Sequence, residues 1–196
     1  HNAKFYGFAR PTRHWLADDR LARCAEAGGL MLQLGVESGS RGLLRRYHKG
    51  VDPADAEAVV AAAAEAGIRT YVYLLLGLPE ETEADREATR QLLVRLGDAV
   101  DFLNLSLFNL PAHCELTSRA DELGLELAPR PPGDDDALRL YRAFRVNGHS
   151  PRQDARRFLK ERLLTTPAVR AAQHRTPKWL RAAHLALLRL EGRRAA

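Results

Sequence analysis

The feature that most constrains this chain is an alternation of strand-like and helix-like segments over its first 128 residues. Apolar runs rich in β-branched and aromatic residues, such as 30–36 (LMLQLGV) and 68–76 (IRTYVYLLL), are typical of strands that are covered on both faces. Between them, the alanine-rich segment 52–67 starts with Asp-Pro and ends with Gly, a pattern that predicts a helix. Strands separated by helices of this length pair in parallel, because the chain must cross back over the sheet before the next strand begins.

The same reasoning applied along the chain predicts an α/β fold. We expect a partial parallel (βα) barrel of about four strands, which are too few to close a barrel alone. The expected strands are residues 5–9, 30–36, 68–76 and 100–110, and the expected helices are 14–29, 40–48, 52–67, 81–98 and 114–124.

A Pro/Gly/Asp-rich stretch at 126–136 predicts a boundary, so we expect a barrel part over 1–128 and a small α-helical extension over 129–196. In the extension we expect helices at 137–146, 150–164, 167–174 and 177–192.

The two parts differ sharply in charge. Residues 1–136 carry 15 Lys and Arg against 22 Asp and Glu, a net charge of −7, whereas residues 137–196 carry 15 against 3, a net charge of +12. A basic tail fits contact with nucleic acid or an acidic partner, or an arginine-rich helical cap that pairs with the acidic front. We favour the cap and do not expect nucleic acid, because the aromatic residues of the tail, Phe144, Phe158 and Trp179, are expected in the core.

Several classes of protein are excluded or disfavoured by what the sequence lacks. No run of about 18 apolar residues predicts a membrane span. The two cysteines, Cys24 and Cys114, have neither metal-ligand nor disulfide-framework spacing, which favours a cytoplasmic location. There is no phosphate-binding loop, dinucleotide fingerprint, Ser-His-Asp order or metal-ligand cluster. The chain starts at His1 without a secretory pattern, so we expect it to be a piece of a longer polypeptide.

Polar residues and glycines gather where the predicted strands end, which is where parallel barrels form their sites. The four strands are followed by ARPT, GVESGS, GLPEET and FNLPAHC, which contribute Arg10, Glu37, Gly77, Glu80, Glu81, Asn109, His113 and Cys114. Several of these segments also have a structural explanation, and His113 and Cys114 suit ordinary loop residues. Ser38 or Ser40 suits a helix cap, the Gly-Leu-Pro sequence at 77–79 suits a turn, and the two glutamates suit the first turn of a helix.

Taken together, GVESGS, a short helix, HKG, a helix that ends in AGI, and GLPEET resemble, in order and spacing, the second half of a radical SAM core domain. The resemblance runs from about residue 5 to 125, and its first strand would be the third of the family. The segment ARRFLKERLLTTPAVRAAQHRTPKWLRAAH is similar to the C-terminal extension of cobalamin-binding radical SAM proteins.

The resemblance implies an enzyme that uses S-adenosylmethionine and a 4Fe–4S cluster to make a 5′-deoxyadenosyl radical, or that performs radical methylation. The family holds the cluster with a CxxxCxxC motif after its first strand, and this sequence has no such motif. We therefore expect an inactive C-terminal portion whose partner is the N-terminal half of the same polypeptide. The cluster ligands, and any cobalamin-binding domain, would lie outside this chain, and the other partners would be a small-molecule cofactor and a substrate.

Carried onto this sequence, the resemblance implies that S-adenosylmethionine is held by the strand ends and the loops after them. Glu37 would lie near the ribose or amino group, and Lys49 near the methionine carboxylate. Residues 75–78 would lie along the adenine, with Glu80 where relatives usually have glycine. The complete set of expected cofactor-binding residues is Glu37, Ser38, Lys49, Leu75, Gly77, Leu78 and Asn109.

Two other functions fit parts of the pattern. One is a different βα-barrel enzyme of aldolase or isomerase type, with Glu37 and Lys49 as acid and base, which requires a buried lysine with a perturbed pKa. The other is a non-catalytic binding module that uses its basic tail.

Overall fold

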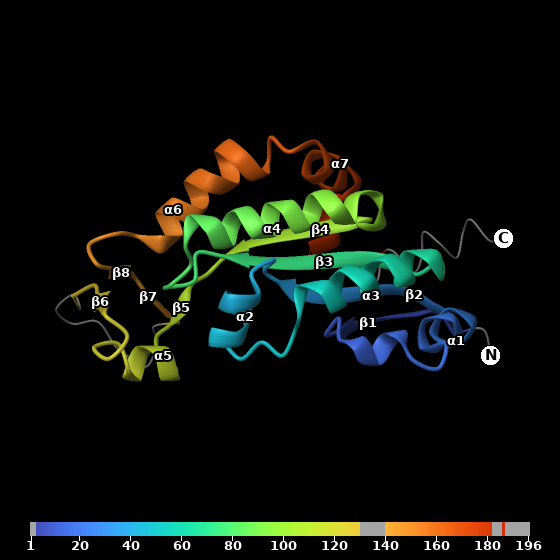
Figure 1. Ribbon diagram of the computed structural model, residues 1–196, viewed down its shortest axis with the longest axis horizontal. Coiled ribbons are helices and arrows are strands. Elements are labelled where there is room, and N and C mark those ends of the chain that lie inside the picture. Colours follow the sequence, from blue (N-terminus) through green and yellow to red (C-terminus); the bar gives the residue numbers. More distant parts are fainter. Residues whose placement is uncertain (1–2, 130–139, 182–185, 187–196) are drawn as a thin grey trace.

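The computed structural model describes residues 3–129, 140–181 and 186, and it confirms an α/β fold built on a parallel sheet (Figure 1). The four strands of this sheet pair in the order β1-β2-β3-β4, and all three pairings are parallel. The strands are β1 (Phe5–Ala9), β2 (Gly29–Glu37), β3 (Arg69–Leu76) and β4 (Phe102–Leu107). Sequential strands are therefore neighbours, as in part of a (βα) barrel.

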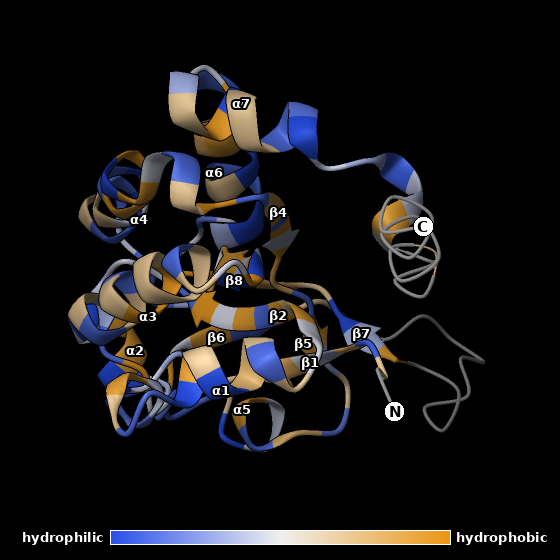
Figure 2. Cartoon of the chain, turned by 90° about the vertical axis from the view of Figure 1, so that its right-hand side faces the viewer, coloured by the Kyte–Doolittle hydropathy of each residue, from blue (hydrophilic) through white to orange (hydrophobic). Residues whose placement is uncertain are grey.

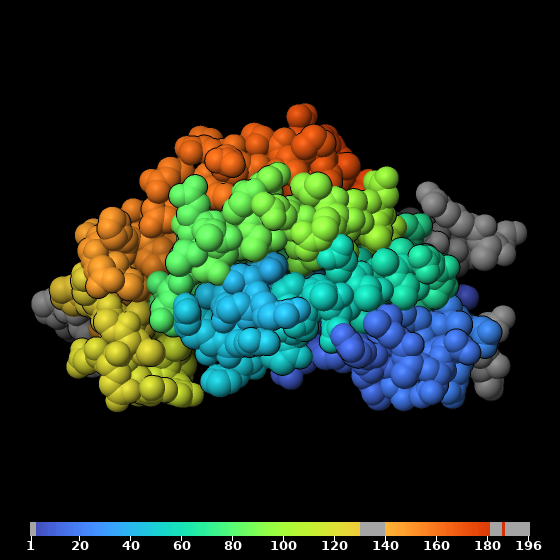
Figure 3. Space-filling model, viewed as in Figure 1, coloured from blue at the N-terminus to red at the C-terminus, as the bar shows by residue number. Residues whose placement is uncertain are grey.

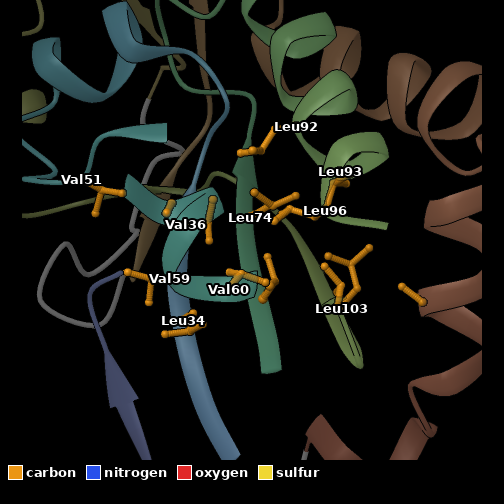
Figure 4. Close-up of a cluster of buried hydrophobic side chains, with 14 of the residues drawn as sticks. Leu34, Val36, Val51, Val59, Val60, Leu74, Leu92, Leu93, Leu96 and Leu103 are labelled. Carbon is orange, nitrogen blue, oxygen red and sulfur yellow. The ribbon is translucent and has the colours of Figure 1, made fainter. Parts of the chain in front are cut away.

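One face of the sheet is apolar and covered by helices. The side chains of alternate residues, such as Leu34, Val72 and Leu103, project to this face because the side-chain direction alternates along a strand. They pack against leucines and valines of the covering helices, including Val59, Val60, Leu92, Leu93 and Leu96 (Figure 4). Figure 2 shows α3 (Pro53–Glu65) and α4 (Glu83–Leu96) on this side of the sheet.

Local sequence signals set the starts of these helices. The side chain of Asp52 accepts a hydrogen bond from the backbone N–H of Ala54 at the start of α3, and Pro53 occupies the first turn. The hydroxyl of Thr82 and the carboxylate of Asp85 form a reciprocal capping box at the start of α4. Short α2 (Arg41–Arg46) is capped by Ser40, whose oxygen accepts from the N–H of Leu43.

The opposite face of the sheet carries larger aromatic and polar side chains. Met31, Tyr71 and Phe102 form a small buried cluster there, and Leu180 from the tail completes it. Further along the strands, the side chain of Phe8 is 74% exposed, so this half of the inner face is open. A closed barrel would place this face inside.

The tail packs on the α4 side of the sheet. Helices α6 (Pro151–Phe158) and α7 (Pro167–Arg175) lie along α4 and β4, with a π-helical turn over Leu159–Leu163 between them. Figure 3 shows these segments as the orange band above the green one. Ion pairs join Arg162 to Glu87 at 3.9 Å and Arg175 to Asp98 at 3.5 Å, so part of the basic tail does contact acids of the front.

Side chains of α7 also occupy the outer edge of β4. The hydroxyl of Thr176 accepts a hydrogen bond from the N–H of Leu103 at 2.9 Å, and the amide of Gln173 donates to the Leu103 carbonyl at 3.0 Å. On α6, the guanidinium of Arg152 donates to the carbonyl of Leu107 at 3.2 Å.

The prediction of a helix over 137–146 is wrong in the described part of this segment, because short strands form within residues 141–146. The short strands β7 (Tyr141–Arg142) and β8 (Phe144–Val146) pair antiparallel with β5 (Leu110–Pro111) and β6 (Leu125–Leu127). Residues 137–139 lie outside the described residues.

Two other helices are shorter than expected, and a third is described only in part. The helix over 14–29 splits into a 3₁₀ turn at Arg13–Leu16 and α1 (Arg20–Glu26), because Asp18 and Asp19 adopt positive φ between them. The helix over 114–124 is only α5 (Glu115–Ser118) followed by turns. Of the helix over 177–192, the described part is a 3₁₀ turn at Lys178–Arg181 and Ala186, and the rest lies outside the described residues.

Candidate functional site

Glu37 ends β2 in an unusual backbone conformation. Its φ is +67°, in the left-handed region that residues with side chains rarely adopt, and the pairing of β2 with β3 shifts register between Gly35 and Glu37. Such bulges and strained residues concentrate at functional sites, where they re-aim a side chain. Here the carboxylate of Glu37 points toward Lys49, with Oε2 lying 3.8 Å from Nζ.

Lys49 is carried by the tight turn after α2. The neighbouring residues His48 and Gly50 both have positive φ, and the N–H of Lys49 donates to the carbonyl of Leu44. A side-chain carbon on Gly50 would lie 3.5 Å from the guanidinium of Arg10, so this turn also lies beside the end of β1. The Lys49 side chain is 31% exposed and that of Glu37 is 29% exposed, so the pair is reachable from solvent.

A cleft of about 350 Å³ opens beside Glu37 on the inner face of the sheet. It combines two charged side chains, Arg10 and Glu37, with apolar and polar walls; the complete lining is Phe8, Ala9, Arg10, Gln33, Gly35, Glu37 and Tyr73. The absence of a side chain at Gly35 keeps the cleft open, since a carbon there would lie 3.3 Å from Oε1 of Glu37.

Two cleft residues, Gln33 and Tyr73, were not among the residues expected from the sequence. The hydroxyl of Tyr73 donates to Oε1 of Gln33 at 2.7 Å, and burial raises the pKa of Tyr73 above its ordinary value. The alternating direction of side chains along the strands could have indicated both residues. Gln33 is a polar residue inside an apolar run, on the face opposite Leu32 and Leu34, and Tyr73 lies on the same face of the next strand.

Ser38 lies behind the strand end and is 1% exposed. Its hydroxyl pairs with the hydroxyl of Thr89 on α4 at 3.1 Å, and it accepts from the N–H of Ser40 at 3.1 Å. Next to it, the backbone of Gly39 touches α4, because a side-chain carbon at Gly39 would lie 2.4 Å from the carbonyl oxygen of Ala88. The SGS sequence therefore fastens the Glu37 strand end to α4.

The GLPEET turn is also packed rather than open. Gly77 has φ +84°, and a side-chain carbon there would lie 3.3 Å from both Ala155 and Arg152 of α6. The space beside Gly77 is thus filled by the tail helix. Leu78 is 4% exposed, while Leu75 is half-buried on the inner face, opposite Ser106 of β4.

Glu81 is the second acid of this turn and lies deeply buried. Its Oε2 accepts from the N–H of Gly77 at 2.6 Å and lies 3.5 Å from Nη1 of Arg86, whose guanidinium stacks over Phe158. Burial raises the pKa of Glu81 to about 7, against the lowering effect of the Gly77 N–H and Arg86. By contrast, Glu80 is exposed and pairs with Arg46 at 3.6 Å.

Asn109 lies apart from the Glu37 cleft, in a second cavity formed with the tail. Its Oδ1 accepts from the guanidinium of Arg152 at 2.5 Å. Cys114 contacts the carbonyl of Pro111 and the hydroxyl of Thr117, and it packs in the small cluster under β5 and β6. Within the described residues, no group of three or more His, Cys, Asp or Glu could hold a metal ion, and Cys24 and Cys114 are both free.

The structure therefore places Glu37 and Arg10 in the lining of the open cleft, and Lys49 pairs with Glu37 beside it. Ser38, Gly77 and Leu78 lie in the packed layer behind the strand ends, Leu75 lies on the inner face, and Asn109 lies in the second cavity.

Comparison with known protein families finds a match in the first half of the chain. The sequence model of the radical SAM superfamily matches residues 4–93, which include the four motifs from GVESGS to GLPEET. Over these residues, the chain is similar to the radical SAM superfamily.

Several solved structures share the fold. One is the Elp3 protein of the archaeon Methanocaldococcus infernus with an N-terminal deletion, at 14% identity and a TM-score of 0.50, over 61% of this chain and 28% of that one. Another is the radical S-adenosylmethionine methyltransferase TsrM from Kitasatospora setae with cobalamin and a 4Fe–4S cluster bound, at 23% identity and a TM-score of 0.53, over 65% of this chain and 25% of that one.

A second TsrM structure, with tryptophan substrate and an S-adenosylmethionine analogue bound, matches at 21% identity and a TM-score of 0.52. The match covers 79% of this chain and 30% of that one. This chain therefore spans less than a third of the length of each of these structures. No curated protein matches the chain in sequence. Among the described residues, no helix is long and apolar enough to cross a membrane.

Proposed function

We propose that this chain supplies S-adenosylmethionine-binding strand ends to a radical SAM enzyme whose cluster-binding half is a separate part of the same polypeptide. The observation that carries the proposal is the Glu37–Lys49 pair, 3.8 Å apart at a strained strand end beside an open cleft. The amino-acid end of S-adenosylmethionine carries both charges, so an acid and a base side by side can each pair with the opposite charge of the ligand.

The residues of the cleft fit such a ligand. Its volume of about 350 Å³ lies within the range of small-molecule sites, roughly 300–1,000 Å³. Phe8 and Tyr73 offer aromatic surface, and the Tyr73–Gln33 pair offers hydrogen-bonding groups. Glu37 would hold an ammonium or hydroxyl of the ligand, and Lys49, with Arg10 beside its turn, would hold the carboxylate. The layer of Ser38, Gly39 and Thr89 fixes the strand end, so little ordering of Glu37 is needed on binding.

The described residues do not fit an iron–sulfur cluster, since they contain no suitable ligand group. In the family, the bound cofactors supply a 5′-deoxyadenosyl radical, and this chain would orient S-adenosylmethionine and shield it from water. We also propose that the parent belongs to the cobalamin-using subclass, because the TsrM structure with cobalamin bound shares the fold over 65% of this chain. Two unpaired cysteines support the cytoplasm as its compartment.

The aldolase or isomerase alternative is less well supported by the site. It requires a lysine that is buried away from solvent, whereas the Lys49 side chain is 31% exposed and ion-paired.

The deciding experiment uses the parent polypeptide, purified without oxygen and reconstituted with iron and sulfide. We expect visible absorption from a cluster and, with reductant, cleavage of S-adenosylmethionine that depends on the cluster. An intact, reduced cluster that neither binds nor cleaves S-adenosylmethionine would refute the enzyme proposal.

The site assignment has its own test in the same protein. Glu37→Ala and Lys49→Ala should each weaken S-adenosylmethionine binding by about tenfold, as expected when one partner of a charge-assisted contact is removed. Glu57→Ala is the matched control, because it breaks a similar half-exposed ion pair, with Arg95, between α3 and α4. Unchanged affinity in both site variants would remove the assignment and leave the fold unaffected.

A further inference from the structure

The second cavity, which holds Asn109, is lined by three arginines that come from two different elements. Arg142 belongs to β7, and Arg152 and Arg156 belong to α6. The cavity has a volume of about 360 Å³ and is lined by residues of β5, β7 and α6, among others. Figure 1 shows these three elements at the same end of the molecule. β7 reaches this position through its antiparallel pairing with β5, which places Arg142 opposite Leu110.

These arginines are not neutralised by acids in the described part of the chain. No Asp or Glu is among the described residues that line the cavity, and no described carboxylate pairs with any of the three. The acids of α6 and its continuation, Asp154 and Glu161, line a different cavity on the other side of the helix. By contrast, the Glu37 cleft contains its own carboxylate.

The hydrogen-bonding capacity of the arginines is only partly used. One nitrogen of Arg152, Nη1, donates to the Leu107 and Phe108 carbonyls and to Asn109. Arg142 donates through Nη2 to the carbonyl of Ala128, while its Nε is buried without a partner among the described residues. Arg156 is exposed and unpaired among the described residues, so its guanidinium can donate to an acceptor bound in the cavity.

The remaining wall of the cavity is aromatic and mildly polar. Phe108, Tyr141 and Phe144 line it, and Phe108 and Phe144 lie edge to face with centroids 6.1 Å apart. Ser150, which caps α6, adds a hydroxyl. This lining suits a ligand that joins an anionic group to an apolar body, with the anion at the arginines.

We propose that this cavity is a binding site for small organic anions that carry a carboxylate or a phosphate. Guanidinium groups bind both anions through paired N–H donors, so the chemistry of recognition is shared. The site is separate from the Glu37 cleft, and the proposal does not depend on the proposed S-adenosylmethionine function.

Binding to this chain can be measured by calorimetry with phenyl phosphate, phenylacetate and the neutral amide phenylacetamide. We expect saturable one-to-one binding of at least one anion and none of the amide. Tighter binding of phenyl phosphate would identify phosphate as the preferred group, and equal or tighter binding of phenylacetate would identify carboxylate. Absence of saturable binding for both anions, or equal binding of the amide, would overturn the proposal.

Two variants of adjacent residues test the location. Arg156 is exposed and has no partner among the described residues, so Arg156→Gln should fold normally and weaken anion binding by about fivefold or more. Arg157→Gln removes the same charge from the next residue, which pairs with Asp154 and lines the other cavity. It should change the affinity less than twofold. Equal weakening by the two variants would show a general effect of the basic tail and would overturn the proposed site, and the melting temperature of each variant checks its fold.

Discussion

Gly39 and Ala88 lie in backbone contact, with the ideal side-chain carbon of Gly39 only 2.4 Å from the Ala88 carbonyl oxygen. The loop that follows Glu37 can therefore approach α4 only where it has no side chain. This contact, and the Ser38–Thr89 hydrogen bond beside it, connect the position of Glu37 to the helix that covers the sheet.

Gly39→Ala should therefore destabilise the chain by about 1–3 kcal/mol or more, because the obstructing atoms belong to backbone and cannot move aside cheaply. Urea unfolding measures the change. Gly42→Ala is the control: its nearest neighbour would be the Ser40 oxygen at 3.8 Å, and in α2 alanine should be neutral or slightly stabilising. Equal stability of the Gly39→Ala variant and the wild type would contradict the contact.

Glu37→Asn should leave the unfolding free energy unchanged or raise it by up to ~1 kcal/mol. Asparagine tolerates the left-handed conformation that Glu37 adopts at φ +67°, and the half-exposed ion pair that is lost contributes little. The same variant should bind S-adenosylmethionine more weakly in the reconstituted parent if the proposed function holds. Chemical denaturation and a binding titration measure the two effects, and a clear loss of stability would show that Glu37 serves the fold instead.

Glu81 should make stability depend on pH between about 4.5 and 7. Its folded pKa of about 7 lies above the ordinary value of 4.5, so the native state holds the proton more tightly than the unfolded state. The contribution of Glu81 to the free energy of unfolding is fully present below pH 4.5 and is lost as the pH rises through 7. This contribution is at most roughly 3 kcal/mol. Urea unfolding at pH 4.5 and pH 8 for wild type and Glu81→Gln measures it.

In that experiment the wild type should lose stability with rising pH relative to Glu81→Gln. The glutamine side chain can still accept a hydrogen bond from the N–H of Gly77. The loss of its charge beside Arg86 changes the stability equally at both pH values, so this effect cancels when the changes in stability between pH 4.5 and pH 8 are compared. Glu80→Gln, at the exposed neighbouring position, should retain the wild-type slope. Identical slopes for wild type and Glu81→Gln would show that Glu81 stays ionised in the folded chain.

Thr176→Val should cost about 1–3 kcal/mol, because the change keeps the shape but leaves the N–H of Leu103 without its acceptor. Thr165→Val is the comparison, since the hydroxyl of Thr165 is exposed and donates only to the carbonyls of Glu161 and Arg162. Thermal and urea unfolding of both variants measure the difference. If the two variants lose equal stability, the hydroxyl of Thr176 has no special importance for β4.

The sheet could be predicted from the sequence because its signals are local. Each strand is an apolar run, each crossover helix carries its own cap, and parallel pairing follows from the length of the crossovers. The strands at 141–146 could not be predicted in this way. These strands form because they pair with β5 and β6, which lie elsewhere in the sequence. The local sequence pattern of 137–146 contains no signal for that pairing.

The proximity of Glu37 and Lys49 was predictable for the same reason. Glu37 and Lys49 are separated by one short helix, so their proximity follows from local structure, and the structure places them 3.8 Å apart. The surroundings of Gly77 and Asn109 depend on α6, which begins more than forty residues later, and only the folded chain shows that this helix lies against both.

The contacts of Thr176, Gln173 and Arg152 with β4 have a consequence for assembly. Exposed strand edges recruit further strands, including those of other molecules, and the described part of the tail occupies hydrogen-bonding groups of Leu103 and Leu107 along this edge. Growth of the sheet is therefore directed to one side. Among the described strands, the other edge of the sheet is that of β1, next to the exposed Phe8, so the tail contacts favour addition of a strand on that side and hinder edge-to-edge pairing along β4.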